Sequence, residues 1–327
     1  GMILFSLLIE KLNSWRSWHL GGLLFIPILC NAKIASNFFT SNFAIMPVRQ
    51  TLVKPDIQLS YLEWNQNPGE ENLLLLHGLA DHALVWSSLG DYLAPHYHII
   101  APDLRGHGES SKPEKDYSFE SAIADLEALM NKLGWTSTHV VAHSWSGKLA
   151  CIWARQNPQR LRSMILVDPI FIWQMPSFLK ATFPTLYRFL SFLKAMGPFA
   201  TYEAAEKQAR QLNQYQGWSP LQQKVFQAGI EQKPDGSWGS KFTIAARDRI
   251  FEEVMQVPGL TVPIHTPTLF VQPKKGLNRQ EWQLKPYKTY LKNLQLCQVP
   301  GNHWPFLTQP EAFNQTVEAF LQENQTP

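Results

Sequence analysis

Short apolar runs recur along the chain from residue 48 onward, and their spacing predicts the strands of a sheet. Residues 58–64 alternate apolar and polar side chains, which is typical of a strand on an antiparallel side of a sheet. Residues 73–76 are four consecutive leucines, as expected for a strand that is covered on both faces. The sequence predicts eight strands in all, at residues 48–53, 58–64, 73–76, 97–101, 138–142, 161–167, 268–272 and 294–299.

Helical patterns lie between these strands. In residues 118–133 apolar side chains repeat at every third or fourth position, as in Phe119, Ile123 and Leu126. Residues 145–156 and 310–322 are expected to form helices as well. Strands that alternate with helices predict an α/β fold, in which a mostly parallel sheet carries helices on both faces.

Residues 170–262 break this alternation. They are rich in aromatic residues and glutamine, carry helical patterns and contain no clear strand. The segment is too long for an ordinary connection between a strand and the next element. We therefore expect an inserted helical domain over residues 170–262, and a core made of residues 46–169 and 263–327.

Residues 1–45 differ from the chain that follows. Their two apolar runs, residues 2–9 and 20–30, are both shorter than the ~20 residues needed to span a bilayer. No charged segment precedes the first run, as a secretory signal requires, and Gly1 before Met2 is typical of a scar from tag removal. We favour an apolar extension upstream of a start at Met46. Weak contact of residues 2–30 with a membrane surface is the alternative.

Composition and charge narrow the function classes. The chain has 29 Lys and Arg against 26 Asp and Glu, and no basic block stands out, which argues against a nucleic-acid partner. The three cysteines are far apart and form no CxxC pair, so a reducing, cytoplasmic location is the simplest expectation. The histidines show no metal-ligand spacing, and we expect neither a metal nor a cofactor.

The strongest chemical signal lies at residues 140–147. An apolar strand ends, Ser144 follows, and a helix begins at once. A nucleophile on such a sharp turn needs small residues two positions before and after it, and here these are Ala142 and Ser146. The helix N-terminus beneath Ser144 would stabilise a developing anion. The alternative interpretation is that Ser144 only caps the helix.

This segment resembles the nucleophile elbow of the α/β-hydrolase fold, and three other motifs agree with that family in their order. The motifs are His77-Gly78-Leu79, Asp103-Leu104-Arg105-Gly106-His107-Gly108-Glu109-Ser110 and Gly301-Asn302-His303-Trp304-Pro305. The resemblance runs from about residue 46 to the C-terminus. It implies a mostly parallel eight-stranded sheet flanked by helices, with an inserted helical cap.

The resemblance also implies roles for single residues. Ser144 would be the nucleophile and His303 the general base, since a hydroxyl needs an imidazole to take its proton. The backbone N–H groups of Leu79 and Trp145 would form the oxyanion hole.

The third member of the triad is less clearly marked. The commonest family position, after the strand at residues 268–272, holds no Asp or Glu before Glu281. Asp168 ends the preceding core strand, the place from which haloalkane dehalogenases and some lipases of this fold take their acid. We expect Asp168 to be the acid, while Glu281 and the absence of any acid remain open.

Several other residues carry weaker expectations. Asp103 and Arg105 are expected to hold their loop by hydrogen bonds, and Lys148 is expected to face solvent. Four aromatic residues are candidates for the lining of the substrate pocket, with an ordinary core position as the alternative for each, namely Trp86, Trp173, Trp304 and Phe306.

Together these features predict a serine hydrolase that cleaves an ester or related acyl bond of a small, fairly apolar substrate through an acyl-enzyme at Ser144. A serine at this position argues against dehalogenase and epoxide-hydrolase chemistry, for which the resemblance calls for Asp. A catalytically weak or inactive binding protein, a carbon–carbon bond hydrolase and a perhydrolase are the alternatives. The sequence does not predict the oligomeric state.

Overall fold

The computed structural model describes residues 46–66, 71–176 and 196–325. The expectations for residues 1–45, including the tag scar and the membrane contact, lie outside the described residues, as does part of the insertion.

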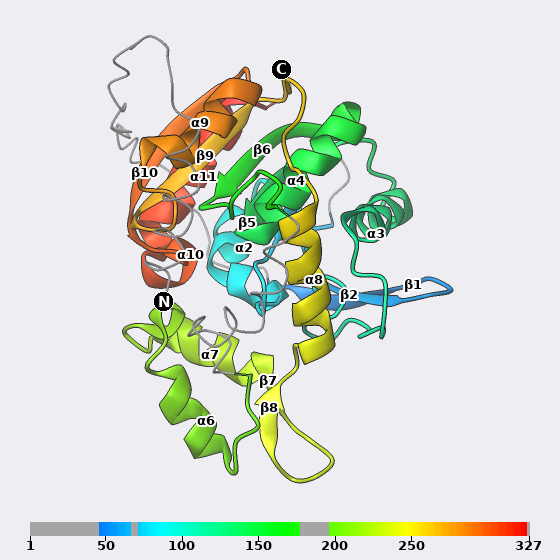
Figure 1. Cartoon of the computed structure of the whole chain (residues 1–327), viewed down its shortest axis with the longest axis vertical. Helices are drawn as coiled ribbons and strands as arrows, with labels where there is room; N and C mark the ends of the chain where they lie inside the picture. Colours follow the sequence, from blue (N-terminus) through cyan, green and yellow to red (C-terminus); the bar gives the residue numbers. More distant parts are fainter. Residues whose placement is uncertain (1–45, 67–70, 177–195, 326–327) are drawn as a thin grey trace.

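An eight-stranded sheet forms the centre of the molecule (Figure 1). Its strand order is β1-β2-β4-β3-β5-β6-β9-β10; β1 pairs antiparallel with β2, β2 pairs antiparallel with β4, and all other pairs are parallel. The eight predicted strands are confirmed, with ends that differ by three residues or fewer. Their bounds are β1 Val48–Val53, β2 Gln58–Trp64, β3 Glu71–Leu76, β4 Tyr97–Pro102, β5 Thr138–His143, β6 Leu161–Val167, β9 Thr268–Lys275 and β10 Leu294–Asn302.

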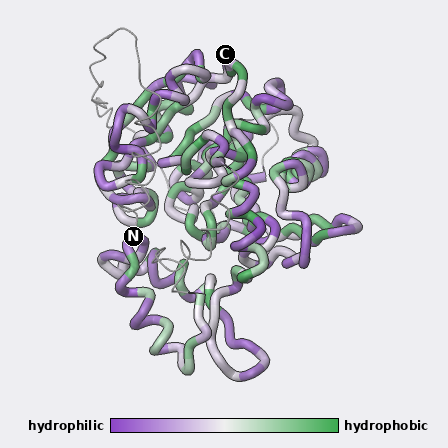
Figure 2. Tube along the Cα trace, viewed as in Figure 1, coloured by the Kyte–Doolittle hydropathy of each residue, from purple (hydrophilic) through white to green (hydrophobic). Residues whose placement is uncertain are grey.

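Helices cover both faces of this sheet. One face packs against α3 (Phe119–Lys132), α4 (Trp145–Gln156) and α9 (Glu281–Tyr290). The other packs against α2 (Ser87–Leu93), α10 (Pro305–Thr308) and α11 (Pro310–Glu323). In the described part of the core, two short 3₁₀ helices are present, η1 (Ala83–Trp86) and η2 (Pro158–Arg160). Figure 2 shows hydrophobic residues along the central strands, and every residue of β5 is buried, as its cover on both faces requires.

The described part of the insertion is not purely helical. It contains α6 (Tyr202–Ala209), η5 (Asn213–Tyr215), α7 (Pro220–Gly229) and α8 (Ile244–Gln256). Between α7 and α8 lies an antiparallel pair, β7 (Ile230–Gln232) and β8 (Trp238–Ser240), which corrects the expectation of a segment without strands. Strands of three residues are too short to produce a periodic pattern. Figure 1 shows α6, α7 and this pair grouped beside one end of the sheet, while α8 runs next to α4.

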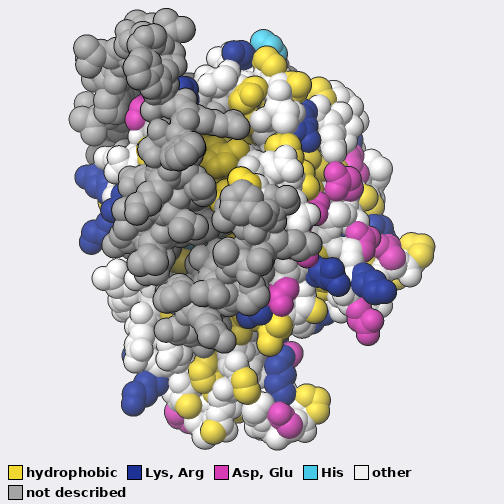
Figure 3. Space-filling view, viewed as in Figure 1, with side chains coloured by type: hydrophobic (Ala, Val, Ile, Leu, Met, Phe, Trp, Pro, Cys, Tyr) yellow, Lys and Arg dark blue, Asp and Glu magenta, His cyan; other side chains and the backbone are white. Residues whose placement is uncertain are grey.

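Charged side chains of both signs lie interspersed on the face of the molecule in Figure 3. No continuous basic patch appears among the described residues on that face. This agrees with a net charge of only +3.

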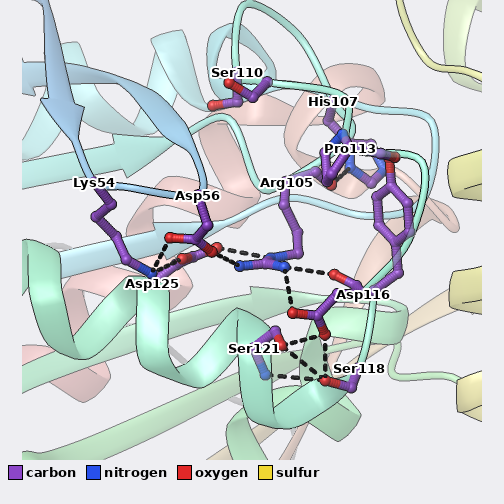
Figure 4. Close-up of polar contacts among 12 residues, drawn as sticks. Lys54, Asp56, Arg105, His107, Ser110, Pro113, Asp116, Ser118, Ser121 and Asp125 are labelled. Atoms are coloured by element: carbon purple, nitrogen blue, oxygen red, sulfur yellow. Dashed lines mark hydrogen bonds and ion pairs between the residues drawn. The ribbon is translucent and has the colours of Figure 1, made fainter.

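A buried ion-pair network holds the loop after β4 (Figure 4). The Arg105 Nε donates to Asp125 Oδ2 at 2.8 Å, and Lys54 Nζ donates to Asp125 Oδ1 at 2.6 Å. Arg105 and Asp125 are both almost fully buried, whereas Asp56, 3.6 Å from each of the two cations, is exposed. The network joins the loop to α3 and to the turn between β1 and β2, so the prediction that Arg105 holds its loop is confirmed.

Replacing Asp125 with asparagine is expected to lower the free energy of unfolding by about 3 kcal/mol, because it leaves two cations without their shared buried partner. Urea denaturation of the wild type and the variant measures this change. The matched control is Asp56→Asn, whose exposed carboxylate should contribute less than about 1 kcal/mol. Equal losses in the two variants would contradict the assignment of Asp125 as the anchor.

Candidate active site

Ser144 sits on a strained turn between β5 and α4. Its φ of 57° lies in a region that side-chain-bearing residues rarely adopt, and its side chain makes no capping hydrogen bond to the helix. The turn is closely packed: the Ser146 hydroxyl donates to the His77 carbonyl at 2.6 Å, and a Cβ on Gly147 would lie 2.6 Å from Pro169. The strain and the small neighbours agree with a turn that presents a side chain, rather than with a simple helix cap.

Three side chains from distant parts of the sequence form one hydrogen-bonded chain. His303, in the loop after β10, lies with Nε2 3.1 Å from Ser144 Oγ. Its other ring nitrogen, Nδ1, lies 2.6 Å from Asp168 Oδ2. An ionised carboxylate can only accept a hydrogen bond, so the ring proton lies on Nδ1. Nε2 then carries a lone pair that can accept the proton of the Ser144 hydroxyl. These two contacts have the order that a nucleophile, a base and an orienting acid require.

The Asp168 carboxylate is fully buried and surrounded by donors. Oδ2 accepts from the Leu277 backbone N–H at 2.7 Å, and Oδ1 accepts from the Asn278 side chain at 2.9 Å. Burial alone would raise the pKa of Asp168, but the hydrogen bond and charge of His303, together with these donors, hold it below its ordinary value. A Cβ on Gly276 would lie 2.6 Å from Oδ2, so the loop after β9 closes directly over the carboxylate.

The competing acid, Glu281, lies elsewhere. It is the first residue of α9, its side chain is 74% exposed, and it forms a surface ion pair with Lys288 at 2.7 Å. Asp168 reaches His303 because β6, which it follows, lies between β5 and β9 in the sheet. The structure therefore brings Asp168, and not Glu281, to the imidazole.

Two backbone N–H groups lie in the segments next to Ser144. Trp145 is the first residue of α4, where helix geometry leaves the N–H without an intrahelical acceptor. Leu79 lies in the loop after β3, and neither its N–H nor that of Trp145 donates to another described residue. Both groups are thus free to serve an external acceptor.

Trp86 and Phe306 are core residues, which corrects the expectation that they line a pocket. Both are almost fully buried, and their rings pack against each other with centroids 4.5 Å apart. Phe313 of α11 packs against Trp86 from another side. Large aromatic residues are common in both cores and pockets, so their sequence positions alone do not distinguish the two.

Of the two other aromatic candidates, Trp304 packs against His303, with ring centroids 4.7 Å apart. Trp304 follows His303 directly, is 8% exposed, and donates from Nε1 to Asp81 Oδ2 at 3.2 Å. Trp173, in the insertion, is partly buried and packs against Trp282 with ring centroids 5.7 Å apart.

His143 and Asp81 are two buried residues that the sequence did not single out as functional. His143 Nε2 donates to the His303 carbonyl at 2.8 Å, and its Nδ1 lies 3.5 Å from Asp81 Oδ2. The only signal in the sequence was their position beside recognised motifs, directly before Ser144 and two residues after Leu79.

Lys148 does not face solvent, contrary to expectation. It is fully buried in α4, and its Nζ donates to the backbone carbonyls of Val254 at 2.6 Å and Trp173 at 3.2 Å. It thereby ties the helix after Ser144 to the insertion. Burial lowers the pKa of Lys148 to about 7, against the opposing effects of Cys151 and Glu253. A neutral amine has two N–H donors, which match these two carbonyls.

This buried amine predicts a rise in stability with pH. Below pH 7 the lysine is protonated in the folded and unfolded states alike, so its contribution is constant. Above pH 7 the folded state releases the proton while the unfolded state keeps it, so the free energy of unfolding increases. From pH 7 to pH 9 the wild type should gain about 2 kcal/mol relative to Lys148→Met, measured by urea denaturation. A difference that does not change with pH would contradict a depressed pKa.

Two further features, a metal site and a membrane-spanning helix, were sought among the described residues. Within residues 46–66, 71–176 and 196–325, no group of three His, Cys, Asp or Glu side chains is placed to hold a metal ion. No helix in these same ranges is long and apolar enough to cross a bilayer.

Comparisons with known proteins show the family of this chain. A family model described as the alpha/beta hydrolase fold matches residues 71–252. An uncharacterized protein of Mycobacterium tuberculosis is 38% identical over 96 residues, which are 29% of this chain and only 28% of that protein. A haloalkane dehalogenase of Mesorhizobium japonicum is 32% identical over 134 residues, 40% of this chain and 43% of that protein. Epoxide hydrolase 4 of Mus musculus is 24% identical over 78% of this chain and 74% of its own.

Solved structures show the same fold. The crystal structure of E-2-(acetamidomethylene)succinate hydrolase has a TM-score of 0.69 at 20% identity and covers 84% of this chain and 99% of its own. A marine microorganism esterase has a TM-score of 0.65 at 24% identity and covers 80% of this chain and 98% of its own. With a family model that matches more than half of the chain, these findings show that the chain belongs to the α/β-hydrolase fold family.

Proposed function

We propose that this chain is a serine hydrolase that cleaves an ester or related acyl bond of a small, fairly apolar molecule. The observation that carries the proposal is the buried hydrogen-bonded chain from Ser144 Oγ through the imidazole of His303 to the carboxylate of Asp168. This arrangement is the one that activates a hydroxyl for acyl transfer.

In the proposed reaction, Ser144 Oγ attacks the carbonyl carbon while His303 Nε2 takes the hydroxyl proton. The Asp168 carboxylate holds Nδ1–H and stabilises the imidazolium that forms. The carbonyl oxygen becomes an oxyanion that accepts from the N–H groups of Leu79 and Trp145. When the tetrahedral intermediate collapses, His303 returns the proton to the leaving oxygen. A water molecule, activated by the same imidazole, then releases the acyl group from Ser144.

The nucleophile distinguishes this chemistry from that named for two of the relatives, a haloalkane dehalogenase and an epoxide hydrolase. A serine that displaced a halide or opened an epoxide would form an ether. An ether has no carbonyl carbon for water to attack, so the enzyme would not turn over. An acyl group on Ser144 is an ester, which water hydrolyses with the help of His303. The serine therefore supports acyl transfer.

The proposed substrate is a small molecule. The insertion contributes the aromatic side chain of Trp173, which suits an apolar group. The charges of the chain do not suit a nucleic acid, and we propose none as a partner. The two cysteines among the described residues, Cys151 and Cys297, are both buried, and neither is placed as a solvent-exposed disulfide, in keeping with the proposed cytoplasmic location.

The proposal is tested with a fluorophosphonate probe and a panel of esters of increasing chain length. We expect covalent labelling at the Ser144 peptide, identified by mass spectrometry, because the probe reacts only with an activated serine. His303→Asn should abolish labelling, since it removes the base and leaves the hydroxyl in place. A chain that is folded, unlabelled and inactive on all esters would overturn the proposal and favour the binding-protein alternative.

A further inference from the structure

A small cavity of ≈ 40 Å³ lies between the loop after β3 and the described part of the insertion. The loop contributes Ala80, Asp81 and His82, and the insertion contributes residues that include Tyr215 and Phe226. His82 Nε2 donates to the Val225 carbonyl of α7 at 2.9 Å, so the two walls are bonded to each other. The proposed mechanism makes no use of this cavity.

The Asp81 carboxylate is a buried acceptor with spare capacity. The residue is only 7% exposed. Its Oδ2 accepts from Trp304 Nε1 and lies 3.5 Å from His143 Nδ1, but its Oδ1 makes no hydrogen bond to the described residues. Burial alone would raise the pKa of Asp81, but the neighbouring His143 ring holds it below its ordinary value. Because Asp81 lines the cavity, this oxygen is an acceptor that a donor group inside the cavity can use.

A second polar atom lines the same cavity. The Tyr215 hydroxyl makes no hydrogen bond to the described residues, although the tyrosine lines the cavity with Asp81. Burial, together with the negative charge of Asp81, raises the pKa of Tyr215, so its hydroxyl keeps its proton and can donate or accept. Among the described residues, no Lys or Arg forms an ion pair with Asp81.

One wall of the cavity contacts residues beside the proposed catalytic groups. Asp81 lies two residues after Leu79, and the side chain that binds it, Trp304, directly follows His303. A volume of ≈ 40 Å³ has room for roughly three water-sized groups. This is the size of the polar end of a substrate, not of a whole substrate.

From these contacts we propose that the cavity is a specificity subsite, in which Asp81 and Tyr215 bind an N–H or O–H donor group of the substrate. The inference rests on the proposed acyl-transfer function and adds a substrate class to it. The preferred substrates are esters that carry an ammonium or hydroxyl group on an otherwise apolar chain. Esters that carry a carboxylate are rejected, because two carboxylates in one buried cavity repel each other.

The first test measures kcat/KM for matched esters whose chains end in methyl, hydroxyl, ammonium or carboxylate, with the group placed on the acyl half in one series and on the alcohol half in another. In at least one series the donor-bearing ester should be favoured over the carboxylate ester by about tenfold or more. Asp81→Asn and Tyr215→Phe should each reduce that ratio. Asp235→Asn, which removes an exposed carboxylate in the turn between β7 and β8, is the matched control and should leave the ratio unchanged.

The second test does not depend on turnover. It measures binding of methylammonium, methanol and formate to Ser144→Ala by ligand-detected NMR. Methylammonium should bind in a saturable way, formate should not, and adding Asp81→Asn should remove the binding. Equal ratios in wild type and variants, or formate binding as well as methylammonium, would overturn the subsite. If the proposed function fails, the fluorophosphonate does not label Ser144 and no ester is cleaved. The NMR binding of methylammonium and formate still decides whether the subsite exists.

Discussion

Replacing Ser144 with alanine is expected to lower kcat on a cleaved ester by about 10⁶-fold, while the protein keeps its fold. The hydroxyl is the proposed nucleophile, and its neighbours cannot replace it, because the hydroxyl of Ser146 is bonded to the His77 carbonyl. The N–H groups of Leu79 and Trp145, the proposed oxyanion hole, remain in the variant, so a small residual rate above the uncatalysed reaction is expected. Steady-state kinetics with an active ester measures the loss.

The control for this variant is Ser237→Ala, in the exposed turn between β7 and β8. It makes the same chemical change away from the site and should leave kcat unchanged. Circular dichroism and thermal melting check that Ser144→Ala is folded; relief of the positive φ is not expected, since alanine is no better suited to that conformation than serine. A variant that retains more than a hundredth of the wild-type kcat would contradict the nucleophile assignment.

The sheet could be predicted from the sequence because its strands are bounded by strong local signals. β5 is an apolar run that ends at the motif around Ser144, and β6 is another that ends at Asp168-Pro169. In both, burial on two faces removes polar residues from the strand, and the turn residues mark its end. The short pair β7–β8 and the helices α2 and α9 lack such signals. α9 even contains Pro286, which argues against a helix in a sequence-based prediction.

The chemistry of the site was only partly readable from the sequence, for a different reason. Ser144 and His303 lie in motifs that are local in the chain. Lys148 was expected to face solvent, because a surface helix normally keeps one face in water. Both the sheet and the insertion cover α4, so ten of its residues are buried, and this cover cannot be predicted from the local sequence. Trp86 and Phe306 show the opposite error: they were expected to line a pocket but lie in the core. Nothing in their local sequence distinguishes a core position from a pocket-lining position.

Replacing Asp168 with asparagine is expected to lower kcat by about 10⁴-fold. The carboxylate accepts from His303 Nδ1 at 2.6 Å and so keeps Nε2 free to take the proton of Ser144. An asparagine amide can donate to Nδ1 instead, which would favour the tautomer with its proton on Nε2 and stop that nitrogen from acting as a base. Asparagine also has no charge to stabilise the imidazolium. The loss should fall on kcat, since Asp168 is buried beneath the loop of Gly276 and does not contact a substrate.

Glu281→Gln is the matched control, because it neutralises the other acid that the sequence offered. Its carboxylate is exposed and paired with Lys288 on the surface, so kcat should change by less than twofold. In Asp168→Asn, one carboxylate oxygen becomes an amide NH₂ group, so the Leu277 and Asn278 donors share a single acceptor oxygen. A lower melting temperature is therefore expected alongside the kinetic loss. Kinetics are therefore measured well below the melting temperature of the variant. A large loss of kcat in Glu281→Gln with little change in Asp168→Asn would overturn the assignment of the acid. A large loss in Asp168→Asn alone would tie the proton transfer at Ser144 to the carboxylate at the end of β6.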